Sequence, residues 1–182
     1  MRRHRINCPL VIERVSHHER YKDELLSLIS QSDGETITND NNDWISRGDY
    51  HYPENRISHY KPLFMTIIIP IIKGMIKEFV HETNNGTFLG TPGLPWFQQY
   101  QKYDTHSWHD HLSSNGSFLS IIHYLELPKG SPGTEFLDPY TGRIQRPKVK
   151  EGDVLMFPSF ISHRSPPNQS NKRKTIISMN IK

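Results

Sequence analysis

Three histidines and an aspartate fall within six positions in the stretch HSWHDH, residues 106–111. The stretch comes just before a run that is typical of a β-strand. In a strand the side chains at i and i+2 point to the same face, so His109 and His111 would project together while Asp110 faces away. Imidazole is the commonest side-chain ligand of transition metals. The spacing therefore predicts two of the ligands of a metal site.

A third ligand has to come from elsewhere in the chain, and His163 is the best-placed candidate. It follows the strand-like run GDVLMFPS and opens a proline-rich turn. Three protein ligands on one face of an ion leave coordination positions open, as a catalytic centre requires and a closed structural site does not. A lone histidine is more often a surface or hydrogen-bonded residue. The combination of His163 with the strand spacing is what predicts a metal centre.

Two helices and a set of short strands would have to position these residues. Ser16 can cap a helix over 17–31, and a second helix is expected over 61–84, ending near the sequence NNG. From about residue 87 the chain changes to strand-like runs punctuated by glycine and proline, namely TFLG, WFQQYQKYD, SFLSIIHYLEL, TEFLD, KVKEGDVLMFPS and KTIISMNI. Helices followed by many short strands indicate an α+β chain with a β-sandwich or small barrel backed by helices.

The segment between the two helices, residues 33–60, is polar and rich in Asn, Asp, Gly and aromatic residues, without a sustained period. It predicts a long loop. Loops of this length in a compact domain are usually functional lids or disordered. A lid would cover the site and contact substrate through Trp44, Arg47, Tyr50, Tyr52 and Arg56, and a merely exposed loop is an equal alternative.

Length and composition limit the class of protein. A chain of 182 residues predicts one domain, 1–182, with helical support and a lid loop over 1–86 and a β core over 87–182. The net charge of +3 is scattered, with no basic block that would bind nucleic acid. The single Cys8 and the absence of an apolar leader favour a reducing, cytoplasmic compartment. Proline and lysine interrupt the most apolar segment, 62–79, so no membrane span is expected.

The second half of the chain resembles the Fe(II)- and 2-oxoglutarate-dependent oxygenases. The pieces that carry the resemblance are HDH, EGDVLMFPS, SHRSPPN and a basic run before the last strand. They occur in the family's order from about residue 95 to the C-terminus, and they are closest to the prolyl-4-hydroxylase-like branch and the oxygenases of bacteriophage genomes. The resemblance implies a double-stranded β-helix, a jelly-roll or cupin-like fold, with N-terminal helices packed against one sheet. It also favours a phage protein made in a host cytoplasm.

In that family iron is held by a His-x-Asp/Glu pair and a distal histidine, which match His109 and His163. The position of the carboxylate is occupied here by His111. Iron is then bound by three histidines, or water takes the place of His111, or a local bulge lets Asp110 reach the metal. The strand period favours three histidines. The loss of one negative charge weakens the hold on Fe(II) and makes zinc a competitor.

The family also pairs the far carboxylate of 2-oxoglutarate with a basic residue some ten positions past the distal histidine. In NKRKTIISMNI, Lys174 occupies that position, counted back from Asn180, and Arg173 is the reserve candidate. A buried carboxylate requires such a partner. Tyr100 and Tyr124 are the expected hydrogen-bond donors to the same carboxylate, although a tyrosine in a strand more often simply packs.

The resemblance implies a hydroxylase of a peptidyl or free amino acid, with proline by analogy, that converts 2-oxoglutarate and O2 to succinate and CO2. Its expected ligands are Fe(II), 2-oxoglutarate, O2 and an unidentified small-molecule or peptide substrate. One alternative is a cupin-like three-histidine metalloenzyme, either an O2-using dioxygenase or a zinc enzyme, which would not need Lys174 in the barrel. The other is a non-catalytic β-sandwich binding module whose histidines are incidental.

Overall fold

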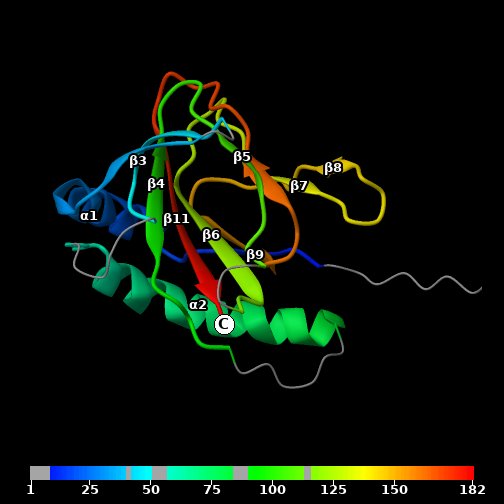
Figure 1. The fold of residues 1–182 in the computed structure, drawn as a ribbon. Coiled ribbons are helices and arrows are strands. Elements are labelled where there is room, and N and C mark those ends of the chain that lie inside the picture. The colour runs from blue at the N-terminus through cyan, green and yellow to red at the C-terminus, as the bar shows by residue number, and fades with distance from the viewer. Residues whose placement is uncertain (1–8, 40–41, 51–56, 84–89, 113–115) are drawn as a thin grey trace, which may run out of the picture.

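The computed structural model describes residues 9–39, 42–50, 57–83, 90–112 and 116–182. Two antiparallel sheets face each other, and two helices lie against the outer face of the larger sheet (Figure 1). The larger sheet has the order β1-β9-β6-β11-β4-β3-β2, and the smaller has the order β5-β10-β7-β8. The α+β class and the double-stranded β-helix fold are confirmed.

The strands of the larger sheet are β1 (Val11–Arg14), β2 (Glu35–Thr38), β3 (Trp44–Gly48), β4 (Trp96–Tyr100), β6 (Leu119–Glu126), β9 (Asp153–Pro158) and β11 (Lys174–Ile181). Those of the smaller sheet are β5 (His106–His109), β7 (Glu135–Leu137), β8 (Ile144–Gln145) and β10 (His163–Ser165). The helices are α1 (His18–Gln31) and α2 (Lys61–Thr83). Both helices lie where the sequence predicts them, and each predicted run after residue 95 contains a strand.

Strand β11 runs through the middle of the larger sheet and separates two cores. Ile177, Met179 and Ile181 point toward the helices, where they pack with apolar residues of α1 and α2 such as Leu25 and Phe64. The alternate positions from Lys174 to Asn180 lie on the other face, toward the smaller sheet. This face belongs to the second core and to the cavity between the sheets. The period of two in KTIISMNI thus gives the strand one face that packs against the helices and another, with Lys174, Ile176, Ser178 and Asn180, that faces the smaller sheet.

The expected long loop over 33–60 differs from the structure. The segment contains the hairpin of β2 and β3, which extends the larger sheet beyond β4. Arg47 fastens the hairpin, because its guanidinium donates to the carbonyl oxygens of Ile29 and Ser32 and lies 5.0 Å above the Phe97 ring. These two strands are short and mostly polar and carry little hydrophobic period, so no local pattern predicts them. The larger sheet is therefore completed by residues from both halves of the chain.

Two histidines are buried where the helices meet the larger sheet. His18 begins α1 and His123 lies on β6, and their rings meet edge to face at 5.6 Å. Within the described part of the chain, neither ring nitrogen of His123 has a hydrogen-bond partner, and neither does Nε2 of His18. Burial lowers the pKa of His123 to about 3, with a smaller contribution from His18. His123 is therefore a neutral, apolar-packed ring at any pH above the acid range.

We expect this buried ring to make the fold sensitive to acid. The folded-state pKa of about 3 lies below the unfolded value of about 6.5, so between these values the unfolded chain binds the extra proton. The free energy of unfolding should fall as the pH drops below about 6.5, by about 1.4 kcal/mol per pH unit for this residue. In His123→Phe the slope of the unfolding free energy against pH should be smaller by about 1.4 kcal/mol per pH unit, the contribution of one proton. Urea unfolding between pH 7 and pH 4 measures this slope. An unchanged slope would mean that His123 takes up a proton in the folded protein.

Neither of the two helices in the described ranges has the length and hydrophobicity of a transmembrane helix.

Candidate active site

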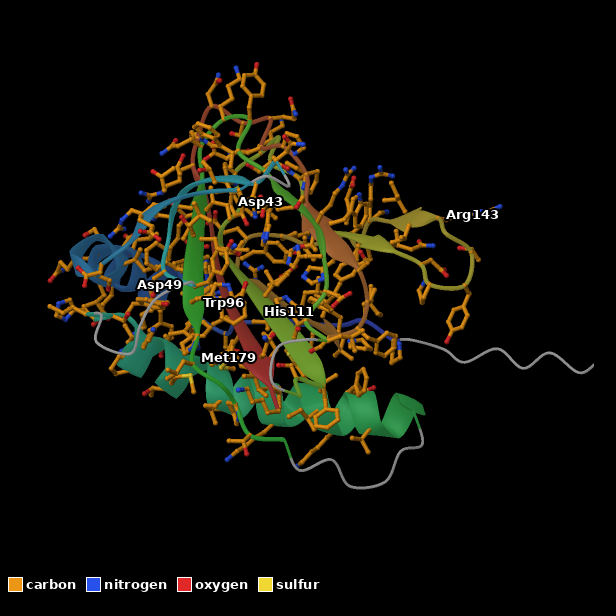
Figure 2. The ribbon with its side chains drawn as sticks, in the orientation of Figure 1. Asp43, Asp49, Trp96, His111, Arg143 and Met179 are labelled. Atoms are coloured by element: carbon orange, nitrogen blue, oxygen red, sulfur yellow. The ribbon has the colours of Figure 1, made fainter. Side chains whose placement is uncertain are left out.

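A cavity of about 440 Å3 lies between the two sheets. Figure 2 labels three residues that line it, Asp43, Trp96 and His111, and each comes from a different part of the chain. Arg143 lies away from it, on the hairpin that joins β7 to β8. Ile176, Ser178 and Asn180, on the face of β11 toward the smaller sheet, line the cavity. A cavity lined by apolar and polar side chains is the usual location of an active site.

The cavity contains the three histidines predicted as metal ligands. His109 ends β5 and His163 begins β10, and the two residues are directly paired across these neighbouring strands. His111 lies two residues beyond the end of β5. One ring nitrogen of each histidine lies within 4.8 Å of one ring nitrogen of the other two. The structure therefore brings together residues 54 positions apart in the chain into a group that could hold a metal ion.

Hydrogen bonds fix the tautomers of two of these rings. Nδ1 of His109 lies 2.8 Å from the carbonyl oxygen of Ser107, and Nδ1 of His163 lies 2.9 Å from that of Ile161. A carbonyl oxygen only accepts, so both Nδ1 atoms carry the proton. In the neutral rings Nε2 then keeps its lone pair free for a metal.

The environment keeps all three rings neutral. Burial lowers the pKa of His109. Burial and then the neighbouring His109 lower the pKa of His163 well below its usual value and that of His111 to about 4. A histidine must be neutral to bind a metal, so the three rings meet this one requirement at neutral pH.

Asp110 stands apart from this group. Its side chain is exposed, and its Oδ1 accepts a hydrogen bond from the backbone N–H of Leu112 at 3.0 Å. The sequence spacing predicts His111 in the same strand as His109. In the structure β5 ends at His109, so His111 lies outside the strand. Its backbone N–H instead donates to the carbonyl oxygen of Ser159 at 2.9 Å. The loop after β5 thus turns the His111 ring, and not the aspartate, toward the other histidines.

The predicted cosubstrate residues lie on the neighbouring strands. Lys174 is 1 % exposed, and its ammonium donates to Ser165 Oγ at 2.7 Å and to the carbonyl oxygen of Pro132 at 3.2 Å. Nζ also lies 4.7 Å from the centre of the Tyr100 ring. Among the described residues no carboxylate forms an ion pair with Lys174. Burial lowers its pKa to about 7.

The two tyrosines differ in their hydrogen bonds. Tyr100 is fully buried, and its hydroxyl has no hydrogen-bond partner among the described residues. The hydroxyl of Tyr124 donates to Thr134 Oγ1 at 2.8 Å. A buried hydroxyl without a hydrogen-bond partner is costly, and so is a buried ammonium that has only neutral partners, unless an anionic acceptor binds there. Lys174 and Tyr100 therefore fit one carboxylate of a dicarboxylate ligand.

Arg173, the reserve candidate, is directed elsewhere. Its guanidinium donates to both carboxylate oxygens of Glu126, at 2.9 and 3.2 Å. The side chain is 38 % exposed, and as the neighbour of Lys174 it points to the other face of the sheet. Arg173 is thus already paired and lies outside the cavity.

Sequence reasoning missed a second group of residues beside the metal ligands. Asp43 is buried; its Oδ1 accepts from the Ser107 N–H at 2.6 Å, and its Oδ2 lies 3.6 Å from His106 Nε2. The His106 ring stacks on His109 at 3.9 Å. Burial alone would raise the pKa of Asp43, but the hydrogen bonds from Ser107 and the charge of His106 lower it. His106 was visible in HSWHDH, whereas nothing in the polar segment distinguished Asp43 from its neighbours.

The expected lid residues are divided. Tyr50 lines the cavity and stacks on His106 at 5.9 Å. Trp44 pairs with Thr105 at the sheet edge and Arg47 fastens the hairpin, so neither lines the cavity. Tyr52 and Arg56 lie outside the described residues.

Comparison with known proteins gives no sequence match but clear structural ones. No family model matches the chain, and neither does any curated protein. A prolyl-4-hydroxylase from Pseudomonas putida superposes with a TM-score of 0.64 at 9 % identity, covering 95 % of this chain and 92 % of its own. A 2OG-Fe(II) oxygenase family oxidoreductase from Burkholderia pseudomallei gives 0.67 at 11 % identity, covering 94 % and 84 %.

A viral collagen prolyl hydroxylase from Paramecium Bursaria Chlorella virus-1, solved as a 2OG complex, gives a TM-score of 0.57 at 13 % identity and covers 94 % of both chains. These identities are low, but the match extends over nearly the whole of each chain. The resemblance seen in the sequence is thus confirmed at the level of the fold. The chain has the double-stranded β-helix fold of the prolyl hydroxylases and other 2-oxoglutarate- and Fe(II)-dependent oxygenases.

Proposed function

We propose that the protein is an Fe(II)- and 2-oxoglutarate-dependent oxygenase that hydroxylates a peptidyl or free amino acid. The reaction converts substrate C–H, O2 and 2-oxoglutarate to substrate C–OH, succinate and CO2. The observation that carries the proposal is the buried ammonium of Lys174, which has no carboxylate partner among the described residues and donates to Ser165, a residue that lines the same cavity as the three convergent histidines. A metal site alone explains the histidines but gives no reason to bury a lysine.

Each part of the site has a role in this proposal. His109, His111 and His163 would hold the metal through their unprotonated nitrogens. Lys174 and the Tyr100 hydroxyl bind the far carboxylate of 2-oxoglutarate, with Ser165 keeping the ammonium in place. When bound, the metal and the cosubstrate supply the activation of O2 and the oxidising chemistry.

The remaining cavity wall would receive the amino-acid substrate. Trp96 and Trp108 supply apolar surface, and Gln98 and Tyr50 supply polar groups. The prolyl hydroxylase of Trichoplax adhaerens, which shares this fold with a TM-score of 0.61, was solved with a peptide fragment of the hypoxia inducible factor. That neighbour supports a peptidyl substrate, and proline is the analogue to test first.

The proposal is tested by cosubstrate turnover. Protein loaded anaerobically with Fe(II) should release succinate and CO2 in equal amounts when O2 and 2-oxoglutarate are added, and proline-containing peptides should accelerate this. Zn(II)-loaded protein should bind 2-oxoglutarate without turnover. If Fe(II) supports O2 uptake without 2-oxoglutarate binding or consumption, the cupin-like alternative holds. If neither metal binds, the fold serves as a binding module.

The third ligand is tested by comparing two neighbouring residues. His111→Ala should weaken binding of Fe(II) on the order of ten- to a hundredfold, whereas Asp110→Ala should do little. His111→Asp should restore the His-x-Asp arrangement and keep 2-oxoglutarate decarboxylation at a changed rate. Metal titration under anaerobic conditions measures all three variants. Loss of metal in Asp110→Ala with retention in His111→Ala would assign the ligand to the aspartate.

A further inference from the structure

His111 differs from the other two histidines in what faces its Nδ1 atom. The nearest polar atom is not a carbonyl oxygen but Nδ2 of Asn180, at 3.4 Å. Asn180 lies near the end of β11, on the same face as Lys174. One strand face therefore carries the predicted cosubstrate anchor near one end and the contact to His111 near the other.

Asn180 is itself held by Ser120, which contacts a second serine. Its Oδ1 accepts from Ser120 Oγ at 2.9 Å, and Ser120 Oγ lies 2.9 Å from Ser159 Oγ. Asn180 and Ser120 are directly paired across β11 and β6. The backbone carbonyl oxygen of Ser159 also accepts a hydrogen bond from the backbone N–H of His111. The ring and the backbone of His111 are thus both tied to this small polar network, and both serines are buried.

The network has two states with the same number of hydrogen bonds. In the state described, Asn180 presents its N–H group to His111, so Nδ1 can only accept and the neutral ring carries its proton on Nε2. A half-turn of the amide exchanges the roles. Oδ1 of Asn180 then accepts Nδ1–H from His111, and Nδ2 donates to Ser120, which donates to Ser159. Serine hydroxyls either donate or accept, so three hydrogen bonds are made in each state.

We propose that His111 binds the metal through Nε2 and that Asn180 is its positioning residue, because the orientation of the Asn180 amide decides which ring nitrogen carries the proton. With the oxygen toward the ring, Nε2 is free as it is in His109 and His163. With the nitrogen toward the ring, Nε2 is blocked by its proton. This inference rests on the proposed metal site and goes beyond it, because it explains how a histidine can work where the related oxygenases have a carboxylate. The amide does for His111 what the backbone carbonyls do for the other two ligands.

The test is a double-mutant cycle on the affinity for Co(II), used as an air-stable probe. Asn180→Leu should weaken Co(II) binding about tenfold in the wild-type protein, since an unsupported ligand loses on this order. In the His111→Ala background the same change should have almost no effect, because its target is gone. Gln145→Leu, an exposed polar-to-leucine change on β8, is the matched control and should leave binding unchanged.

A second measurement reads the tautomer without any metal. Nitrogen-15 NMR of the imidazole of His111 distinguishes the two protonated forms. Asn180→Asp places an acceptor-only carboxylate beside Nδ1 and should move the ring to the Nδ1–H form, even if Asn180→Leu does not fold. An equal loss of affinity from Asn180→Leu in both backgrounds, or an unchanged tautomer in Asn180→Asp, would overturn the proposal. If Co(II) does not bind the wild type at all, the proposed function fails instead.

Discussion

His163→Ala and His109→Ala are each expected to lower the affinity for Fe(II) by more than a hundredfold and to abolish 2-oxoglutarate turnover. Loss of a residue that only supports a metal ligand lowers the metal affinity about ten- to a hundredfold. Loss of a ligand itself should lower it further. Both rings are neutral, and Nδ1 of each is hydrogen-bonded to a carbonyl oxygen, so Nε2 is the nitrogen that each contributes to the metal. Metal content after anaerobic loading and dialysis, measured by mass spectrometry, checks the result.

His59→Ala is the matched control, because His59 is exposed and its side chain lies outside the cavity. It should keep full metal content. His163 is also packed against Phe157 at 4.7 Å and Phe136 at 5.9 Å, so its variant needs a stability check. Retained metal in both ligand variants would place the metal elsewhere in the chain.

The residues that could be predicted from the sequence are those with a strong period or a fixed spacing. KTIISMNI alternates between the helix-facing core and the face toward the smaller sheet, and this alternation placed Lys174 on the face that borders the cavity and Arg173 on the other. The two-residue spacing of His109 and His111 also predicted that their rings converge, and they do, but the loop after β5 and not the strand period directs His111. The alternation within β11 depends on local geometry alone, and strands impose that geometry wherever they form.

The parts that were missed depend on contacts between distant segments. β2 and β3 are short and polar, and they become strands only because β4 offers a free edge. Asp43 reaches the site through this hairpin and accepts the N–H of Ser107, the residue whose carbonyl oxygen orients His109. No spacing in the sequence connects Asp43 with Ser107. Tertiary contacts of this kind override local propensity, which is why the segment was expected to be a loop.

Lys174 shows how a binding site can oppose stability. A lysine that is 1 % exposed, with a pKa lowered to about 7 by burial, makes the fold less stable at neutral pH than an apolar residue would. The unfolded-state pKa is about 10.4, so the unfolded chain binds more protons between these two values. Wild-type stability should therefore rise as the pH increases from about 7 toward 10. Binding of a dicarboxylate offsets this cost by pairing the ammonium.

Lys174→Met is accordingly expected to separate stability from cosubstrate binding. A melting temperature equal to or above that of the wild type at pH 7 is expected, because a methionine of similar length removes the buried charge at the expense of one hydrogen bond to Ser165. Its advantage should shrink as the pH approaches 10. In the same variant a bound 2-oxoglutarate would leave its far carboxylate buried and unpaired, which costs about 3–5 kcal/mol.

That cost corresponds to a loss of 2-oxoglutarate affinity of at least a hundredfold, with Fe(II) affinity nearly unchanged because Lys174 is not one of the grouped ligands. Calorimetric titration of 2-oxoglutarate into metal-loaded protein measures the affinity. Arg173→Met is the matched control and should retain cosubstrate binding, since its guanidinium pairs with Glu126 outside the cavity. The roles would be reversed if Arg173→Met lost 2-oxoglutarate and Lys174→Met kept it. A Lys174→Met protein that melts well below the wild type and yet binds 2-oxoglutarate would show that this lysine is a structural residue.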